Sequence, residues 1–206
     1  MKHLPNILTL SRIPLLFVIV GLLCVGNFAA DVAAFVVFLI AAVSDWLDGY
    51  IARKVGAVSD FGKLMDALTD KIIMVGIFVA LLCLRWPFPG GNGEETLLPR
   101  FCLFLVIIII CREFLITGLR LVAAGTGQVL AAERAGKIKT ALQMISVTVL
   151  LFARLLESAG LESAPGVPAD FSLVREVGLW AFYLAVVLTV YSGVGYIVRN
   201  WKILKI

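Results

Sequence analysis

The run FCLFLVIIIIC, residues 101–111, has no charged side chain and is one of several long apolar stretches in this chain of 206 residues. Of all residues 61% are hydrophobic, whereas 18 are Lys or Arg and 14 are Asp or Glu. A soluble domain of this length could not cover so much apolar surface with so few charged side chains. At about 20 apolar residues per bilayer crossing, the supply suffices for about six spans. The composition therefore excludes a soluble protein and predicts a small membrane domain.

Six apolar stretches are separated by short breaks that contain Gly, Pro and polar residues. The pair Gly26-Asn27 ends the first stretch, and the two longest loops are expected at 87–99 and 158–174. We expect the helices at 7–26, 30–52, 60–86, 100–124, 138–157 and 175–198. The predicted fold is an all-α integral membrane protein with six transmembrane helices, in a single domain over residues 1–206.

Positive charges are distributed unevenly between the two sides of this topology. Six spans place both termini on one side of the membrane, and the side richer in Lys and Arg is normally cytoplasmic. Twelve such residues fall on the side of the termini: Lys2, Arg12, Arg53, Lys54, Lys63, Arg120, Arg134, Lys137, Lys139, Arg199, Lys202 and Lys205. Four fall on the other side: Arg85, Arg100, Arg154 and Arg175. We therefore expect both termini in the cytoplasm.

The remaining composition argues against two classes of binding site. A net charge of +4, with no basic patch interleaved with aromatic residues, gives no reason to expect nucleic-acid binding. The four cysteines, Cys24, Cys83, Cys102 and Cys111, form no C-x-x-C pair, and His3 is the single histidine. Neither a zinc site nor a disulfide framework is therefore expected.

Four aspartates lie inside apolar stretches, where an unpaired charge is costly. Asp45 and Asp48 share one face of the second expected helix, and Asp66 and Asp70 share one face of the third. The short connection makes these helices antiparallel neighbours. At 1.5 Å per residue, both pairs lie on the order of 10–12 Å from the turn. The four carboxylates are therefore expected to meet at one depth.

Four carboxylates in a medium of low dielectric constant cannot all stay ionised without cations, and oxygen ligands suit Mg²⁺ or Mn²⁺. A metal site is one explanation of this cluster. Two others are an ion pathway through a transporter and structural pairing with Lys63 and Lys71. The charges alone do not choose between metal catalysis and these alternatives.

The spacing around the aspartates has the form D-x-x-D-G-x-x-A-R-x8-G-x-x-x-D-x-x-x-D. Its fixed positions are Asp45, Asp48, Gly49, Ala52, Arg53, Gly62, Asp66 and Asp70. At every one of them the chain resembles the signature of the CDP-alcohol phosphatidyltransferase family. The resemblance implies metal-dependent transfer of a phosphoryl-linked group from a CDP-linked lipid to an alcohol, with release of CMP.

The resemblance also implies roles for the residues of the signature. Asp45, Asp48 and Asp66 would ligate divalent metal, Mg²⁺ or Mn²⁺, as a pair of ions that neutralises the pyrophosphate. Asp70 would take the proton of the attacking hydroxyl while also ligating metal. The signature residues expected near the nucleotide or its phosphates are Gly49, Ala52, Arg53 and Gly62. The small residues among them are equally suited, on their own, to close packing of helices.

A second motif opens the first helix. Residues 5–12, PNILTLSR, resemble the P-N-x-x-T-x-x-R entry found in bacterial members of this family. Asn6, Thr9 and Arg12 recur every three residues and form a polar strip able to contact ribose and phosphate of the donor. The alternative is that Asn6 and Thr9 start the helix while Arg12 anchors to lipid phosphate.

Two further segments bear on the acceptor. Residues 112–120, REFLITGLR, and 136–143, GKIKTALQ, resemble the bacterial branch of the family that uses sn-glycerol 3-phosphate. The residues that would bind this acceptor are Arg112, Arg120, Lys137, Lys139, Thr140 and Gln143. The four cations suit an anionic acceptor, and the last two side chains could bond the glycerol hydroxyls. Arg112 could instead pair with Glu113 or a motif aspartate, and Lys137 and Lys139 could serve topology alone.

The sequence therefore predicts an enzyme of phospholipid biosynthesis that transfers the phosphatidyl group of CDP-diacylglycerol to sn-glycerol 3-phosphate, giving phosphatidylglycerophosphate and CMP. The resemblance implies a homodimer in a bacterial inner membrane, surrounded by membrane lipids. The charge pattern predicts that the active site faces the cytoplasm. Another acceptor (inositol phosphate, serine or phosphatidylglycerol) is the alternative within the family. A divalent-cation transporter is the alternative from another class, although it has no use for the D-G-x-x-A-R core.

Overall fold

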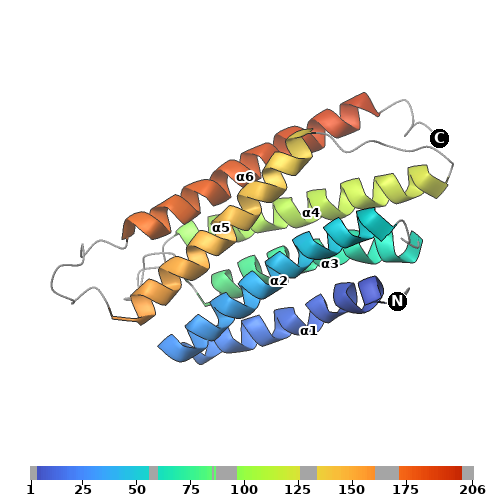
Figure 1. Ribbon diagram of the computed structural model, residues 1–206. Coiled ribbons are helices and arrows are strands. Elements are labelled where there is room, and N and C mark those ends of the chain that lie inside the picture. Colours follow the sequence, from blue (N-terminus) through green and yellow to red (C-terminus); the bar gives the residue numbers. More distant parts are fainter. Residues whose placement is uncertain are drawn as a thin grey trace.

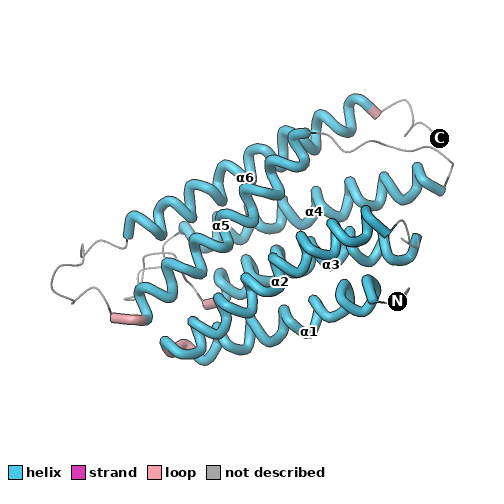
Figure 2. Tube along the Cα trace, in the orientation of Figure 1, coloured by secondary structure: helices cyan, strands magenta, loops and turns pink. Residues whose placement is uncertain are grey.

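The computed structural model describes residues 4–55, 60–84, 86, 97–125, 134–160 and 172–200. These residues form six helices and no strand: α1 Leu4–Val25, α2 Phe28–Val55, α3 Asp60–Cys83, α4 Leu97–Gly125, α5 Arg134–Ser158 and α6 Ser172–Arg199 (Figure 2). The all-α prediction is thereby confirmed. Five helices begin two to four residues before the expected start, whereas α3 ends at Cys83, three residues before the expected end at 86. Periodicity locates the apolar stretch of a helix, whereas its ends depend on local hydrogen bonding.

The turn between α1 and α2 forms where the sequence predicts it. Gly26 has a positive φ of 66°, a conformation that is cheap only for glycine, and it directly follows the last residue of α1. The side chain of Asn27 then caps α2, since its Oδ1 accepts a hydrogen bond from the backbone N–H of Ala30 at 2.8 Å. The pair therefore stops one helix and starts the next.

The six helices alternate in direction along the bundle (Figure 1). The starts of α1, α3 and α5 and the ends of α2, α4 and α6 lie at one end, on the right of the figure. Helix α3 contacts α1, α4 and α5, while α5 contacts α2, α3 and α6. Helices α3 and α5 are thus central, and each faces several neighbours.

The hydrophobic core fills the half of the bundle away from that end. Ile19, Phe38, Ile77 and Val147 come from four different helices and are almost completely buried there. Close packing of α5 and α6 depends on Gly178, where an added Cβ would lie 2.7 Å from Cδ2 of Leu150. The core therefore leaves the opposite half free for polar side chains.

The outer surface is apolar. Phe17, Trp180 and Tyr191 are large side chains that are 70%, 68% and 71% exposed. Among the described residues, three segments are long and apolar enough to cross a membrane: Arg100–Ala123, Ile138–Ser158 and Ser172–Arg199. Three shorter apolar segments accompany them: Ser11–Val25, Phe28–Ser44 and Lys71–Cys83. These features are those of a membrane protein, whereas the expected number of six spans stays a prediction.

Ion pairs join the helices at the end of the bundle where α2 and α6 begin and α5 ends. The Nε of Arg154 on α5 lies 2.9 Å from Oδ1 of Asp31 on α2, and Asp31 is buried. The indole N–H of Trp86 donates to Oε2 of Glu157 at 2.6 Å, and Arg175 on α6 pairs with the other oxygen of Glu157 at 3.3 Å. These contacts stabilise this end of the bundle and share no residue with the polar half at the other end.

Candidate functional site

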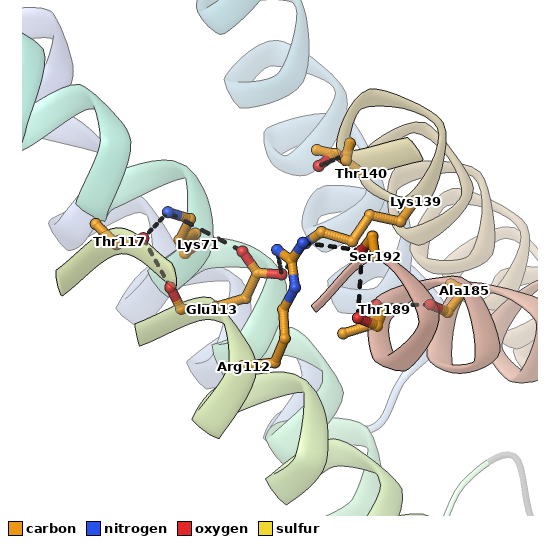
Figure 3. A network of polar contacts seen from close by, with 10 residues as sticks. Lys71, Arg112, Glu113, Thr117, Lys139, Thr140, Ala185, Thr189 and Ser192 are labelled. Carbon is orange, nitrogen blue, oxygen red and sulfur yellow. Dashed lines mark hydrogen bonds and ion pairs between the residues drawn. The ribbon is translucent and has the colours of Figure 1, made fainter. Parts of the chain in front are cut away.

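The polar half of the bundle is organised around one buried carboxylate, Glu113 on α4. Its side chain forms an ion pair with Lys139 on α5, and Oε1 also lies 3.3 Å from Nη1 of Arg112. The second oxygen, Oε2, lies 4.0 Å from Nζ of Lys71 on α3. Glu113 and Lys139 are only 5% and 2% exposed. Figure 3 shows the carboxylate between Lys71 on one side and the two other cations on the other.

Arg112 is also held by α6. Its Nη2 donates to Oγ of Ser192 at 2.8 Å, and the Ser192 hydroxyl donates in turn to the carbonyl of Thr189 at 3.2 Å. Gly193 makes room for the arginine, since an added Cβ there would lie 3.0 Å from its Cγ. The guanidinium is therefore fixed between α4 and α6 (Figure 3).

Two further contacts complete this side of the bundle. The ammonium of Lys71 donates to the hydroxyl of Thr117, which itself donates to the backbone carbonyl of Glu113 at 2.7 Å. One helical turn further, Nε of Arg120 donates to the Tyr196 hydroxyl at 3.4 Å, and its guanidinium lies 5.3 Å from the centre of that ring. The cations are thus anchored by neutral partners as well as by Glu113.

Glu113, Thr117 and the cations around them line a cavity of about 480 Å³. Among the described residues, its wall carries one carboxylate and four cations: Lys71, Arg112, Arg120 and Lys139. An excess of positive charge on the wall of a cavity attracts an anion. Arginine and lysine donors of this kind suit phosphate, which accepts several charge-assisted hydrogen bonds.

Two smaller cavities adjoin this one through shared wall residues. A cavity of about 220 Å³ shares Lys71, Glu113 and Thr140 with it and is also lined by Gln143. Gln143 is 5% exposed, and its Nε2 has no hydrogen-bond partner among the described residues. A third cavity, of about 60 Å³, is lined by Arg12 and again by Thr140. The amide of Gln143 can therefore donate a hydrogen bond to a polar ligand. Thr140 lines all three cavities.

Sequence comparison relates this chain to known proteins. The sequence model of the CDP-alcohol phosphatidyltransferases matches residues 2–191. The chain belongs to the CDP-alcohol phosphatidyltransferase family.

Several relatives in this family are similar to the chain over nearly its whole length. A protein of Bacillus subtilis named CDP-diacylglycerol--glycerol-3-phosphate 3-phosphatidyltransferase is 39% identical, covering 100% of this chain and 98% of the relative. A protein of the same name from Rickettsia typhi is 34% identical over 95% of this chain and 96% of its own length. A plant relative from Arabidopsis thaliana, with that name followed by the number 2, is 32% identical over 98% of this chain and 81% of its own length.

The structure places part of the predicted phosphatidyltransferase site. It brings together five residues of the predicted acceptor set: Arg112, Arg120, Lys139, Thr140 and Gln143. Arg12 of the first-helix motif is buried and lines the adjoining cavity. Arg112 also makes the pairing with Glu113 that was the alternative to a substrate role, at 3.3 Å.

The other predicted site residues have side chains outside the described part of the structure: Asn6, Thr9, Asp45, Asp48, Gly49, Ala52, Arg53, Gly62, Asp66, Asp70 and Lys137. No metal-binding group of three or more His, Cys, Asp or Glu side chains converges among the residues that are described. The predicted metal site therefore depends on the signature aspartates, whose backbone lies at the end of α2 and the start of α3. Carboxylates alone form a donor set that suits Mg²⁺ or Mn²⁺.

Sequence reasoning missed several residues of this site. Lys71 was considered only as a structural partner of the aspartates, although a charge inside an apolar stretch is a signal in its own right. Glu113 was considered only as a partner for Arg112. No sequence pattern marks Ser192, Gly193 or Tyr196 as site residues, because small and aromatic residues are common in membrane helices.

Proposed function

We propose that this chain transfers the phosphatidyl group of CDP-diacylglycerol to sn-glycerol 3-phosphate, giving phosphatidylglycerophosphate and CMP. The observation that carries the proposal is the cavity with four cations and one described carboxylate. Serine, whose carboxylate is offset by its own ammonium, would neutralise little of this charge, whereas a phosphate ester neutralises most of it. The relatives bearing that activity in their names support the same reaction.

The acceptor is held by its two chemically different ends. Its phosphate lies among Arg112, Lys139 and Lys71, whose side chains converge in the larger cavity. Its glycerol hydroxyls reach Thr140 and Gln143, and the buried amide of Gln143 has an unused donor. This arrangement suits an acceptor that carries a phosphate and hydroxyl groups close together. Inositol phosphate shares both features, and the names of the relatives favour sn-glycerol 3-phosphate over it.

The donor lies on the side of α1. Arg12 lines the cavity that meets the acceptor cavities at Thr140, so a nucleotide diphosphate held there is next to the acceptor. The residues that would complete the donor site are Asn6, Thr9, Gly49, Ala52, Arg53 and Gly62. Charge-assisted hydrogen bonds from Arg12 to a phosphate would fix the donor's orientation.

In the reaction, the acceptor hydroxyl oxygen forms a bond to the phosphorus that carries diacylglycerol, and the bond from that phosphorus to the CMP oxygen breaks. The hydroxyl proton passes to Asp70, which acts as general base. The place of Asp70 in the family signature supports its role as the base.

Two divalent ions, Mg²⁺ or Mn²⁺, would be held by Asp45, Asp48, Asp66 and Asp70. When bound, they neutralise the pyrophosphate and stabilise the departing CMP oxygen. These residues belong to the last part of α2 and the first part of α3. Those helix ends lie at the same end of the bundle as the end of α4 and the start of α5 (Figure 1), which carry most of the residues that line the cation cavity. That placement supports a single site made of metal, donor and acceptor.

We further propose six transmembrane spans with both termini in the cytoplasm of a bacterial cell, and a homodimer in the inner membrane. The alternating helix directions support an even number of spans. With that orientation the cavities face the cytoplasm, where both CMP and sn-glycerol 3-phosphate are soluble, while the acyl chains of the donor stay in the bilayer.

A test uses purified protein, CDP-diacylglycerol in mixed micelles and a panel of acceptors: sn-glycerol 3-phosphate, inositol phosphate, serine and phosphatidylglycerol. We expect CMP release and phosphatidylglycerophosphate only with the first acceptor, and only with a divalent metal present. The Asp70→Asn variant should lose at least about 100-fold in kcat because it lacks the base. CMP release with serine but not with glycerol phosphate would reject the acceptor assignment, and metal flux without CMP release would favour the transporter.

A further inference from the structure

Glu113 has no part in the substrate contacts proposed above, yet it is the most highly connected charge in the site. We infer that Glu113 is a positioning residue, which fixes the charged ends of Lys139, Arg112 and Lys71 so that they can bind the acceptor phosphate. The inference rests on the proposed function in that it takes the acceptor to be a phosphate ester. It adds a residue that acts through other residues rather than by contact with the substrate.

The geometry gathers cations from three helices onto one carboxylate. Lys139 on α5 forms an ion pair with one oxygen, Arg112 on α4 contacts the same oxygen at 3.3 Å, and Lys71 on α3 lies 4.0 Å from the other oxygen. A lysine side chain has many rotamers and loses much entropy when it is fixed. Because Glu113 already fixes these side chains in the free protein, that entropy is not lost when the ligand binds.

The charge of the cluster fits a phosphate ester. The described cluster holds three cations and one carboxylate, which leaves two positive charges over. A phosphate monoester carries about −1.5 to −2 at neutral pH. Without Glu113 the three cations would repel each other in a medium of low dielectric constant and separate. Glu113 therefore holds the cations together and still leaves enough charge to bind the ligand.

The experiment replaces Glu113 with Gln, which keeps the shape and removes the charge. Two quantities are measured on the purified full chain: the Kd for inorganic phosphate by calorimetry, and the KM of each substrate from CMP release. We expect Glu113→Gln to raise the phosphate Kd and the acceptor KM by about 10-fold or more. The KM for CDP-diacylglycerol should stay within twofold.

Matched variants separate positioning from folding. Glu157→Gln removes a paired carboxylate at the opposite end of the bundle, and it should leave both KM values within twofold. Glu113→Asp keeps the charge but shortens the side chain, so its acceptor KM should lie between those of wild type and Glu113→Gln. The Asp variant also provides the measurement if the Gln variant does not fold.

A double substitution tests whether Glu113 acts through Lys139. In a Lys139→Gln background, Glu113→Gln should raise the acceptor KM by a smaller factor than it does in the wild type, because one of the three groups that it positions is already gone. An acceptor KM that is unchanged or lowered by Glu113→Gln, or effects that simply add, would overturn the inference.

The failure of this inference is distinguishable from failure of the proposed function. If wild-type protein makes phosphatidylglycerophosphate but Glu113→Gln leaves the acceptor KM unchanged, the function holds and the positioning role is wrong. If the protein makes no such lipid but binds inorganic phosphate in a manner that requires Glu113, the positioning role holds and the reaction is wrong.

Discussion

Replacing Arg112 with Gln removes one guanidinium from the cavity wall and leaves the rest of the cluster in place. Arg112 contacts Glu113 at 3.3 Å and Ser192 at 2.8 Å. After the substitution Glu113 still pairs with Lys139 and lies 4.0 Å from Lys71, so no buried carboxylate is left without a cation. Ser192 keeps its hydrogen bond to the Thr189 carbonyl. The loss should therefore fall on ligand binding rather than on folding.

The expected size of the effect follows from the contact that is lost. A charge-assisted hydrogen bond to a phosphate contributes roughly 1.5–3 kcal/mol, which corresponds to about a 10- to 150-fold loss in kcat/KM. Because Arg112 lines the acceptor cavity, most of the loss should appear as a raised KM for sn-glycerol 3-phosphate. Arg112→Lys keeps the charge without the planar fork and should lose less.

The assay measures CMP release while each substrate is varied in turn. Arg12 provides the comparison, because it lines the adjoining cavity assigned to the donor. Arg12→Gln should raise the KM for CDP-diacylglycerol and leave the acceptor KM nearly unchanged. If Arg112→Gln instead leaves the acceptor KM within twofold and impairs use of CDP-diacylglycerol, the basic cluster binds the donor, and the argument for glycerol phosphate loses its physical support.

Three other predictions concern the metal, the topology and the stability of the fold. Asp48→Asn keeps the shape of a proposed metal ligand but not its charge, so activity should fall at least about 100-fold, and full activity in EDTA would contradict the metal site. In a background without the native cysteines, a cysteine at Gly93 should react with an impermeant thiol reagent from outside the cell and one at Gly56 should not; the reverse pattern would reject the orientation. Asp31→Asn removes the buried carboxylate that pairs with the partly buried Arg154, which keeps its hydrogen bond to the Leu23 carbonyl. The change should cost about 1.5–3 kcal/mol of folding free energy, seen as a lower Tm with normal activity in the folded fraction. An unchanged Tm would show that this pair contributes little.

Sequence periodicity determined the helices and their limits well. Apolar stretches long enough to span a bilayer, separated by residues such as Gly26 and Asn27, predict helix starts and stops from local chemistry alone. The signature from Asp45 to Asp70 indicated the family, and the match over residues 2–191 confirms it. The metal ligation by these aspartates stays a prediction, as do the six spans and the homodimer.

The sequence by itself also identified most of the charged residues that matter, because a charge in an apolar stretch is costly wherever the chain folds. It identified Arg112 in this way, and Lys139 through the resemblance of residues 136–143 to the bacterial branch of the family. Only the tertiary structure decided that both meet on Glu113 together with Lys71 from α3. Ser192 on α6 joins the site from 80 residues away in the chain. The physical reason is that periodicity fixes the face of a helix on which a residue lies, whereas its partners depend on how the helices pack, and packing follows from shape complementarity over the whole bundle.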